Sequence, residues 1–253
     1  MTTSTTAVAP AAAPRATRVL AQARFETMTL LRNGEQLLVS LVLPALALVG
    51  LTGAQYPDLD APRVHVIAPG VLALAIASTA FTGQAISTAF DRRYGVLRMF
   101  GVSPLGRGGL LAGKLLAVLS VLVIQVGVLG SIATALGWRP ALSGIPLALV
   151  AGLLGTAAFL GLGLLLAGTL RAEAVLALAN LVWVLLLGMG LLLPVVTLPS
   201  WAESLARMLP SGALGEALRS TLSGAGLPIW TVAVLAAWAT VSWVLSARFF
   251  RWA

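Results

Sequence analysis

The residues that could do chemistry lie mainly in one charged interior segment, residues 91–114. Its five basic side chains stand between two long apolar stretches and are Arg92, Arg93, Arg98, Arg107 and Lys114. Its end, residues 108–115, differs by one residue from the phosphate-binding loop G-x-x-x-x-G-K-[ST]. Leu115 replaces the hydroxyl residue that would hold magnesium, and no strand pattern precedes the segment. We therefore do not predict nucleotide binding here, and we interpret Lys114 as a side chain that extends along apolar surface to the membrane interface.

The sequence contains no other pattern typical of a catalytic or metal site. It has no cysteine, and its one histidine, His65, cannot build a metal site alone. It shows no nucleophile beside a base, no paired carboxylates and no metal-ligand spacing. Carriers that couple to ions usually place an acidic residue or a histidine near the middle of a span, and this chain does not. The residues therefore give no support to an ion-coupled carrier.

Uncharged polar residues do occur inside the apolar stretches. An amide in lipid demands a hydrogen-bond partner, which a substrate or a neighbouring helix can supply. Bonding between helices is the more common of these two uses. We name four residues as a possible substrate path: Gln84, Thr88, Gln125 and Asn180.

The composition places the chain in a membrane. Its 253 residues are 59% hydrophobic and 9% charged, whereas soluble domains carry roughly 25% charged residues. The net charge of +8 is scattered around apolar stretches, which favours a role in membrane orientation over binding of nucleic acid. The preference for arginine over lysine, with abundant alanine and glycine, suggests a GC-rich bacterial genome. We therefore expect a bacterial cell (inner) membrane protein.

Six apolar stretches predict membrane spans, each of which needs about 20 residues. They cover residues 37–53, 64–90, 110–136, 145–170, 174–198 and 228–247. Pro44 and Pro194 fall inside predicted spans, where neighbouring helices tolerate a kink. With the N-terminus inside, twelve of the 16 basic residues fall in cytoplasmic segments and four outside. This bias predicts that both termini are cytoplasmic.

The segments outside the spans also carry helical patterns. Residues 1–14 are rich in Thr, Ala and Pro, do not resemble a signal peptide and are expected to be a disordered tail. Residues 15–36 predict a helix with charged and apolar residues interleaved, which we interpret as interfacial on the cytoplasmic surface. An extension of the first span into water is the alternative.

Two further short helices are predicted between spans 5 and 6. Ser200 and Glu203 have the spacing of a capping box at the start of the first helix. Leu214, Leu218 and Leu222 form an apolar stripe on the second, opposite a polar face. The sequence therefore predicts an all-α membrane protein with six transmembrane helices, a cytoplasmic N-terminal amphipathic helix and short amphipathic helices on the outer surface.

This pattern resembles the permease subunits of ABC-2 type exporters, the drug- and lipid-exporting class that includes daunorubicin-type permeases. The most specific part is residues 91–105, DRRYGVLRMFGVSPL, followed by Gly113-Lys114. In that family the corresponding loop begins with acidic or basic residues and continues as Gly-Thr-Leu-Glu-x-Leu-x-x-(Thr/Ser)-Pro. Residues 91–105 are similar to this pattern. Asp91 stands where Glu is usual, and Arg98 stands where the family often has Glu, which reverses a charge.

The resemblance implies a single transmembrane domain over residues 15–253 and a complex with ABC ATPase subunits and a second permease chain, identical or paralogous. ATP and magnesium would bind the ATPase, with no cofactor on this chain. The exported substrate would be hydrophobic or amphipathic, such as a drug or a lipid. A membrane-embedded enzyme and a non-transporting assembly or sensor subunit remain as alternatives. The loop that would couple to the ATPase comprises Asp91, Arg92, Arg93, Tyr94, Gly95, Val96, Leu97, Arg98, Ser103 and Pro104.

Overall fold

The structure of the 253-residue chain is a computed structural model that describes residues 13–54 and 62–251. The predicted disordered tail, residues 1–14, lies almost wholly outside these ranges. Within them the chain forms helices and no strand, so the prediction of an all-α fold is confirmed.

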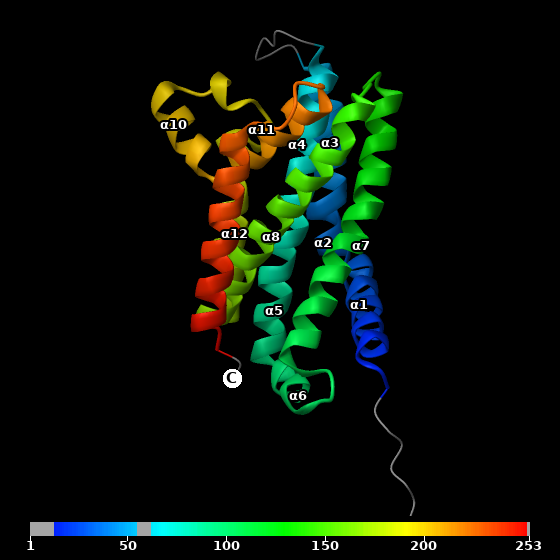
Figure 1. The fold of residues 1–253 in the computed structure, drawn as a ribbon, viewed down its shortest axis with the longest axis vertical. Helices are drawn as coiled ribbons and strands as arrows, with labels where there is room; N and C mark the ends of the chain where they lie inside the picture. Colours follow the sequence, from blue (N-terminus) through cyan, green and yellow to red (C-terminus); the bar gives the residue numbers. More distant parts are fainter. Residues whose placement is uncertain (1–12, 55–61, 252–253) are drawn as a thin grey trace, which may run out of the picture.

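Six helices in the described ranges are long and apolar enough to cross a membrane, so the predicted number of spans is confirmed. In chain order they are Gly34–Gly53, Arg63–Arg93, Gly106–Ala135, Leu142–Thr169, Ala172–Leu191 and Ile229–Phe249. They run side by side along the long axis of this multi-pass membrane protein (Figure 1). One end of the bundle carries helix α6 (Val96–Val102) and the other carries α11 (Pro210–Leu222). We call these the α6 end and the α11 end.

Three of the spans contain π-helical turns, which often lie near functional sites. Span 1 consists of α2 (Gly34–Leu37), a π turn at Leu38–Val42 and α3 (Leu43–Gly53). Span 2 consists of α4 (Arg63–Ala77), a π turn at Ser78–Gly83 and α5 (Gln84–Arg93). Span 5 consists of α9 (Ala172–Leu186) and a π turn at Leu187–Leu191. The remaining spans are α7 (Gly106–Ala135), α8 (Ile145–Thr169) with a 3-10 turn at Leu142–Gly144, and α12 (Ile229–Phe249).

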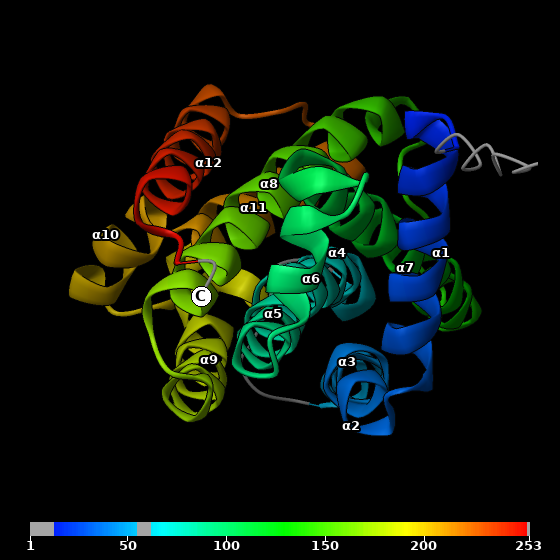
Figure 2. The same ribbon diagram turned by 90° about the horizontal axis from the view of Figure 1, so that it is seen from below.

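Span 2 is the centre of the bundle. It is the most deeply buried of the six, and Figure 2 shows it surrounded by α3, α7, α8 and α9. Small residues on α8 allow a close approach to span 2. A Cβ atom on Gly163 would lie 2.8 Å from the carbonyl oxygen of Phe81, so a larger residue there would push spans 2 and 4 apart.

Span 5 ends earlier than predicted. Met189 and Gly190 leave the helical conformation, with φ of Gly190 at 84°, and the helix stops at Leu191 instead of residue 198. Glycine adopts this left-handed conformation without the steric penalty of a Cβ atom. Pro194 therefore lies beyond the span and precedes a 3-10 turn at Val195–Thr197, so its predicted position inside a span was wrong.

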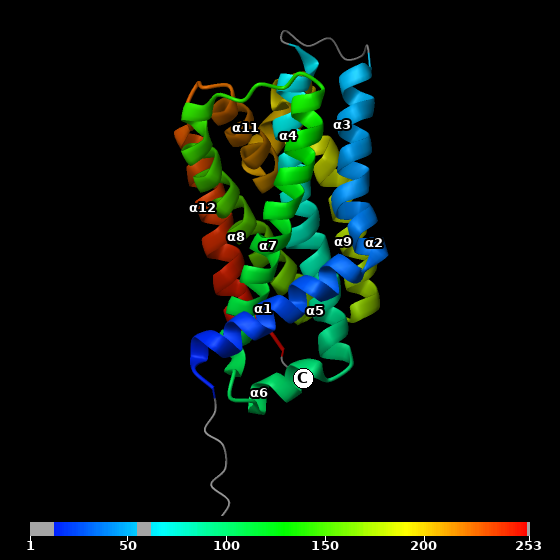
Figure 3. The ribbon, with the colours of Figure 1, turned by 90° about the vertical axis from the view of Figure 1, so that its right-hand side faces the viewer.

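The N-terminal helix is separate from span 1, although the sequence predicted one helix over residues 15–36. Helix α1 covers Arg15–Arg32, and Asn33 has an extended backbone. The Asn33 side chain accepts a hydrogen bond from the Gln36 amide at 3.1 Å and so caps α2. This break lets α1 lie across α7 before the chain turns into span 1 (Figure 3).

The first helix between spans 5 and 6, α10 (Ser200–Met208), forms without the predicted capping box. Pro199 occupies the N-cap position, and Ser200 is already helical. Glu203 pairs instead with Arg207, one turn further along, at 2.8 Å. Pro199 supplies the extended backbone that a helix start needs, so the serine hydroxyl is not required there.

Helix α11 does not lie on the outer surface as predicted. It is buried among α4, α8 and α12 at the α11 end, and both its apolar and its small residues are enclosed. Glycine and alanine make up four of its thirteen residues, and this small volume lets the helix enter the bundle. On the predicted polar face Arg219 is buried too, whereas Glu216 and Ser220 are half-buried.

Candidate functional site

The loop predicted to couple to a partner is a compact helical hairpin at the α6 end. Span 2 ends at Arg93, α6 follows, and α7 begins at Gly106. Gly95 and Gly106 have positive φ values of 76° and 67°, so each supplies a sharp turn that other residues adopt only with strain. The hydroxyl of Ser103 donates to the carbonyl oxygen of Phe100 at 2.9 Å and fixes the second turn.

Some side chains of the hairpin face outward and others anchor it to the bundle. Tyr94, Arg98 and Met99 are exposed, whereas Leu97 is buried against the bundle. An aromatic ring, a guanidinium and a thioether exposed on one hairpin can offer both apolar contact and charge to a second protein. The charge reversal at Arg98 therefore falls on the exposed surface of the hairpin.

Arg92 and Arg93 tie the hairpin to the rest of the bundle. The Arg92 guanidinium donates to the carbonyl oxygen of Leu170, and Arg93 pairs with Glu173. Leu170 and Glu173 flank the short connection from span 4 to span 5. These arginines thus join the end of span 2 to the end of span 4 and the start of span 5. The sequence did not predict these contacts.

Lys114 forms a buried ion triad, so its predicted extension to the membrane interface was wrong. Its side chain is 1% exposed, with Nζ 2.9 Å from Glu26 Oε1 and 3.0 Å from Asp91 Oδ2. Gln22 donates a further hydrogen bond to Glu26 Oε1 at 3.0 Å. A buried ammonium needs such compensation because leaving water costs several kcal/mol. The triad joins α1, the end of span 2 and the start of span 3.

Gly113 makes this triad possible. A Cβ atom at Gly113 would lie 2.7 Å from Cγ of Gln22, so a glycine lets α1 approach α7 closely. Residues 108–114 are helical throughout, which differs from the loop that a phosphate-binding sequence forms. The sequence did hold a signal for the triad, because Lys114 is the only lysine of the chain and Glu26 is the acidic residue in the middle of a basic helix.

The four polar residues named as a substrate path lie on three different spans. Gln125 accepts a hydrogen bond from Thr79 at 3.0 Å, which is a contact between spans 2 and 3. Gln84 and Thr88 are buried, and their polar side-chain atoms have no hydrogen-bond partner among the described residues. Asn180 is exposed on α9.

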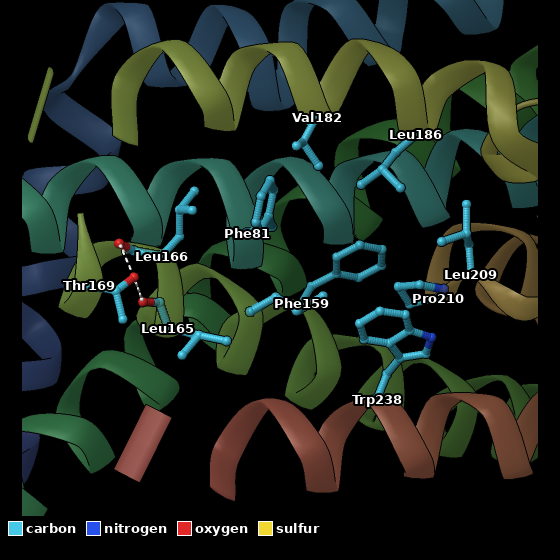
Figure 4. A pocket seen from close by; sticks show the side chains of 11 residues that line it. Phe81, Phe159, Leu165, Leu166, Thr169, Val182, Leu186, Leu209, Pro210 and Trp238 are labelled. Carbon is cyan, nitrogen blue, oxygen red and sulfur yellow. Dashed lines mark hydrogen bonds between the residues drawn. The ribbon is translucent and has the colours of Figure 1, made fainter. Parts of the chain in front are cut away.

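An apolar pocket of about 390 Å³ lies between spans 2, 4, 5 and 6 (Figure 4). Phe81 and Phe159 meet at its centre with ring centroids 6.5 Å apart, and Trp238 at one end donates to the carbonyl oxygen of Met208 at 2.9 Å. The pocket suits a hydrophobic ligand. Sequence reasoning missed it because its lining comes from distant segments: Phe81, Phe159, Leu162, Leu165, Leu166, Thr169, Val182, Leu186, Leu209, Pro210 and Trp238.

A second buried cation closes the break in span 5. Arg219 donates to the carbonyl oxygens of Gly190 at 2.7 Å and Leu191 at 3.0 Å, which the interrupted helix leaves without amide partners. Burial lowers the pKa of Arg219 to about 10, and Glu216, 3.6 Å away, opposes this shift. The guanidinium therefore stays charged at neutral pH and fixes α11 against the end of span 5.

Comparison of the sequence with models of protein families finds a match over most of the chain. A family model described as ABC-2 type transporter matches residues 17–223, from α1 to the end of α11. The matched region includes the hairpin, the ion triad and the buried Arg219. A comparison with curated proteins finds no match. Since the family model covers most of the sequence, the chain belongs to the ABC-2 type transporter family.

Proposed function

We propose that this chain is the permease subunit of an ATP-driven ABC exporter of hydrophobic or amphipathic compounds, drug-like, lipid or similar, in a bacterial cell (inner) membrane. The observation that carries this proposal is the hairpin at the α6 end with its buried ion triad. The distribution of basic residues supports a cytoplasmic α6 end. There a separate ATPase, with its own ATP and magnesium, would contact the hairpin, and a second permease chain, identical or paralogous, would complete the complex.

The hairpin has the connections that a mechanical coupling element needs. A force applied to α6 acts directly on α5 and α7, which are stiff helices continuous with spans 2 and 3. Through Lys114 it also reaches Glu26 and α1, and through Arg92 it reaches the connection between spans 4 and 5. ATPase contact at one exposed surface would therefore reposition several spans together.

We propose the apolar pocket as the place where the hydrophobic part of the substrate binds, because its lining matches that chemistry. Gln84 and Thr88 remain the best residues for the polar part of the path, since their polar atoms are buried and unpartnered. Gln125 and Asn180 complete the proposed path. Gln125 would give up its hydrogen bond with Thr79 to bind the substrate, and Asn180, which is exposed, would face the other permease chain.

The test is co-purification of ATPase activity with the tagged chain in mild detergent, followed by transport in proteoliposomes. We expect Tyr94→Ala and Arg98→Glu to lower the co-purified ATPase activity, because both side chains are exposed on the hairpin. Arg139→Glu reverses an exposed charge at the α11 end and serves as the matched control. Product formation by the chain alone would favour a membrane enzyme, and ATPase association without transport would favour a sensor subunit.

A further inference from the structure

Helix α1 exposes large apolar side chains on the face turned away from the bundle, and its buried face is mixed, with Ala23 and Leu30 beside polar residues. Its inward face carries Gln22 and Glu26, which serve the ion triad. Its outward face carries Leu20, Phe25 and Met28, which are 62%, 65% and 46% exposed. Apolar side chains turned away from a protein indicate contact with another low-dielectric surface.

The outward face also carries positive charge. Six residues line a shallow depression along it: Ala21, Arg24, Phe25, Met28, Thr29 and Arg32. The two arginines bracket the aromatic and the thioether, and eight residues of helix place them about 12 Å apart. Neither arginine has an ion-pair partner among the described residues, and the only acid of α1, Glu26, faces inward. The face therefore offers two free guanidinium groups around an apolar centre.

The position of α1 along α7 places this face at the membrane boundary. Helix α7 has 30 residues and is about 45 Å long, whereas the hydrocarbon core is about 30 Å thick. Roughly ten residues of α7 must project, and the charged residues place this excess at the α6 end. Helix α1 packs along this part of α7, from Gln22 at Gly113 to Leu30 beside Ala117, and then leads into span 1 (Figure 3).

We propose that the outward face of α1 binds anionic phospholipid, with Arg24 and Arg32 on the headgroup phosphate and Phe25 and Met28 among the upper acyl carbons. Arginine donates paired hydrogen bonds to phosphate, and aromatic and aliphatic side chains suit the adjoining acyl region. Lipid is favoured over a soluble partner because α1 leads through the single residue Asn33 into span 1, whose own surface must lie in the bilayer. The proposal needs only a membrane-embedded chain, so it stands or falls separately from ATP-driven export.

The depth of α1 is measurable because the chain has no cysteine, so one introduced cysteine is the only labelling site. A nitroxide label at Thr29→Cys would be compared in phosphatidylcholine nanodiscs with labels at Val123→Cys and Met99→Cys. Val123 is exposed in the middle of span 3 and gives the lipid standard, and Met99 is exposed on the hairpin and gives the water standard. We expect the Thr29 label to be more accessible to oxygen than to a polar nickel chelate, as at Val123. A label as accessible to nickel as at Met99 overturns the proposal.

The headgroup preference is tested by titrating short-chain phosphatidylglycerol or phosphatidylcholine into the detergent-solubilised chain and following the Tm. We expect phosphatidylglycerol, and not phosphatidylcholine, to raise the Tm of the wild type. The double variant Arg24→Gln with Arg32→Gln should bind phosphatidylglycerol about 30-fold more weakly, equivalent to about 2 kcal/mol. The matched control removes two exposed arginines elsewhere, Arg98→Gln with Arg139→Gln, and should retain the effect. Comparing the two lipids within each variant separates binding from any change in basal stability.

Three further outcomes overturn the proposal. Equal stabilisation by both lipids would show that the arginines do not read the headgroup. Equal stabilisation by inorganic phosphate would assign the site to a free anion. A Thr29 label that leaves water only when an ATPase is added would make this face a protein contact.

Discussion

Replacing Lys114 by methionine removes the cation of the buried triad while keeping nearly the same volume. Glu26 then loses its cation partner in a site where its side chain is only 10% exposed, and Asp91, which is 32% exposed, can recruit water. Removing one partner of a buried ion pair costs about 3–5 kcal/mol. Because Asp91 is partly hydrated, we expect the lower half of that range, about 3–4 kcal/mol, for Lys114→Met.

The same reasoning predicts a rescue. Lys114→Met combined with Glu26→Gln and Asp91→Asn leaves no unpaired charge in the site, so the desolvation cost of such a charge is removed. We expect this triple variant to recover most of the loss. Arg207→Ala breaks an exposed pair at the α11 end and should cost no more than about 0.5 kcal/mol.

The assay is unfolding in mixed micelles with increasing sodium dodecyl sulfate, followed by the fluorescence of the seven tryptophans. The free energies of unfolding of the wild type, Lys114→Met, the triple variant and Arg207→Ala are compared. A Lys114→Met variant within about 0.5 kcal/mol of wild type would refute the view that the triad holds these helices together. So would a triple variant no more stable than Lys114→Met.

Three further predictions concern the other contacts of the bundle. Gly113→Val brings new atoms against Gln22 and should loosen α1, seen as faster proteolysis after Arg24, whereas unchanged proteolysis would contradict the close approach. Arg219→Met leaves the carbonyl of Gly190 and its neighbour unpaired and should cost about 2–4 kcal/mol in the same unfolding assay, and a cost below 1 kcal/mol would show that water replaces the guanidinium. Phe159→Trp enlarges a side chain in the apolar pocket and should lower transport in proteoliposomes without lowering ATPase association, and unchanged transport would separate the pocket from the substrate path.

The sequence alone determined the number of spans and the place of the hairpin at the α6 end. Both are local properties: a run of about 20 apolar residues has few alternatives in a membrane, and residues such as Gly95 and Ser103 set turns within a few positions. The same reasoning found α10, because its helical spacing is also local. It placed the end of span 5 wrongly because an apolar stretch does not reveal that Gly190 adopts a positive φ.

Only the tertiary structure decided which charges are buried and with what partners. Lys114 meets Glu26 across 88 positions of sequence, and Arg219 meets the broken end of span 5. Each of these charges looked like a surface residue because hydropathy treats every charge as exposed. The sequence did not predict the apolar pocket for the opposite reason, because Phe159 and its neighbours have the composition of residues that face lipid. In a membrane protein the outer surface and the core are both apolar, so composition does not distinguish them, and the packing of the helices makes that choice.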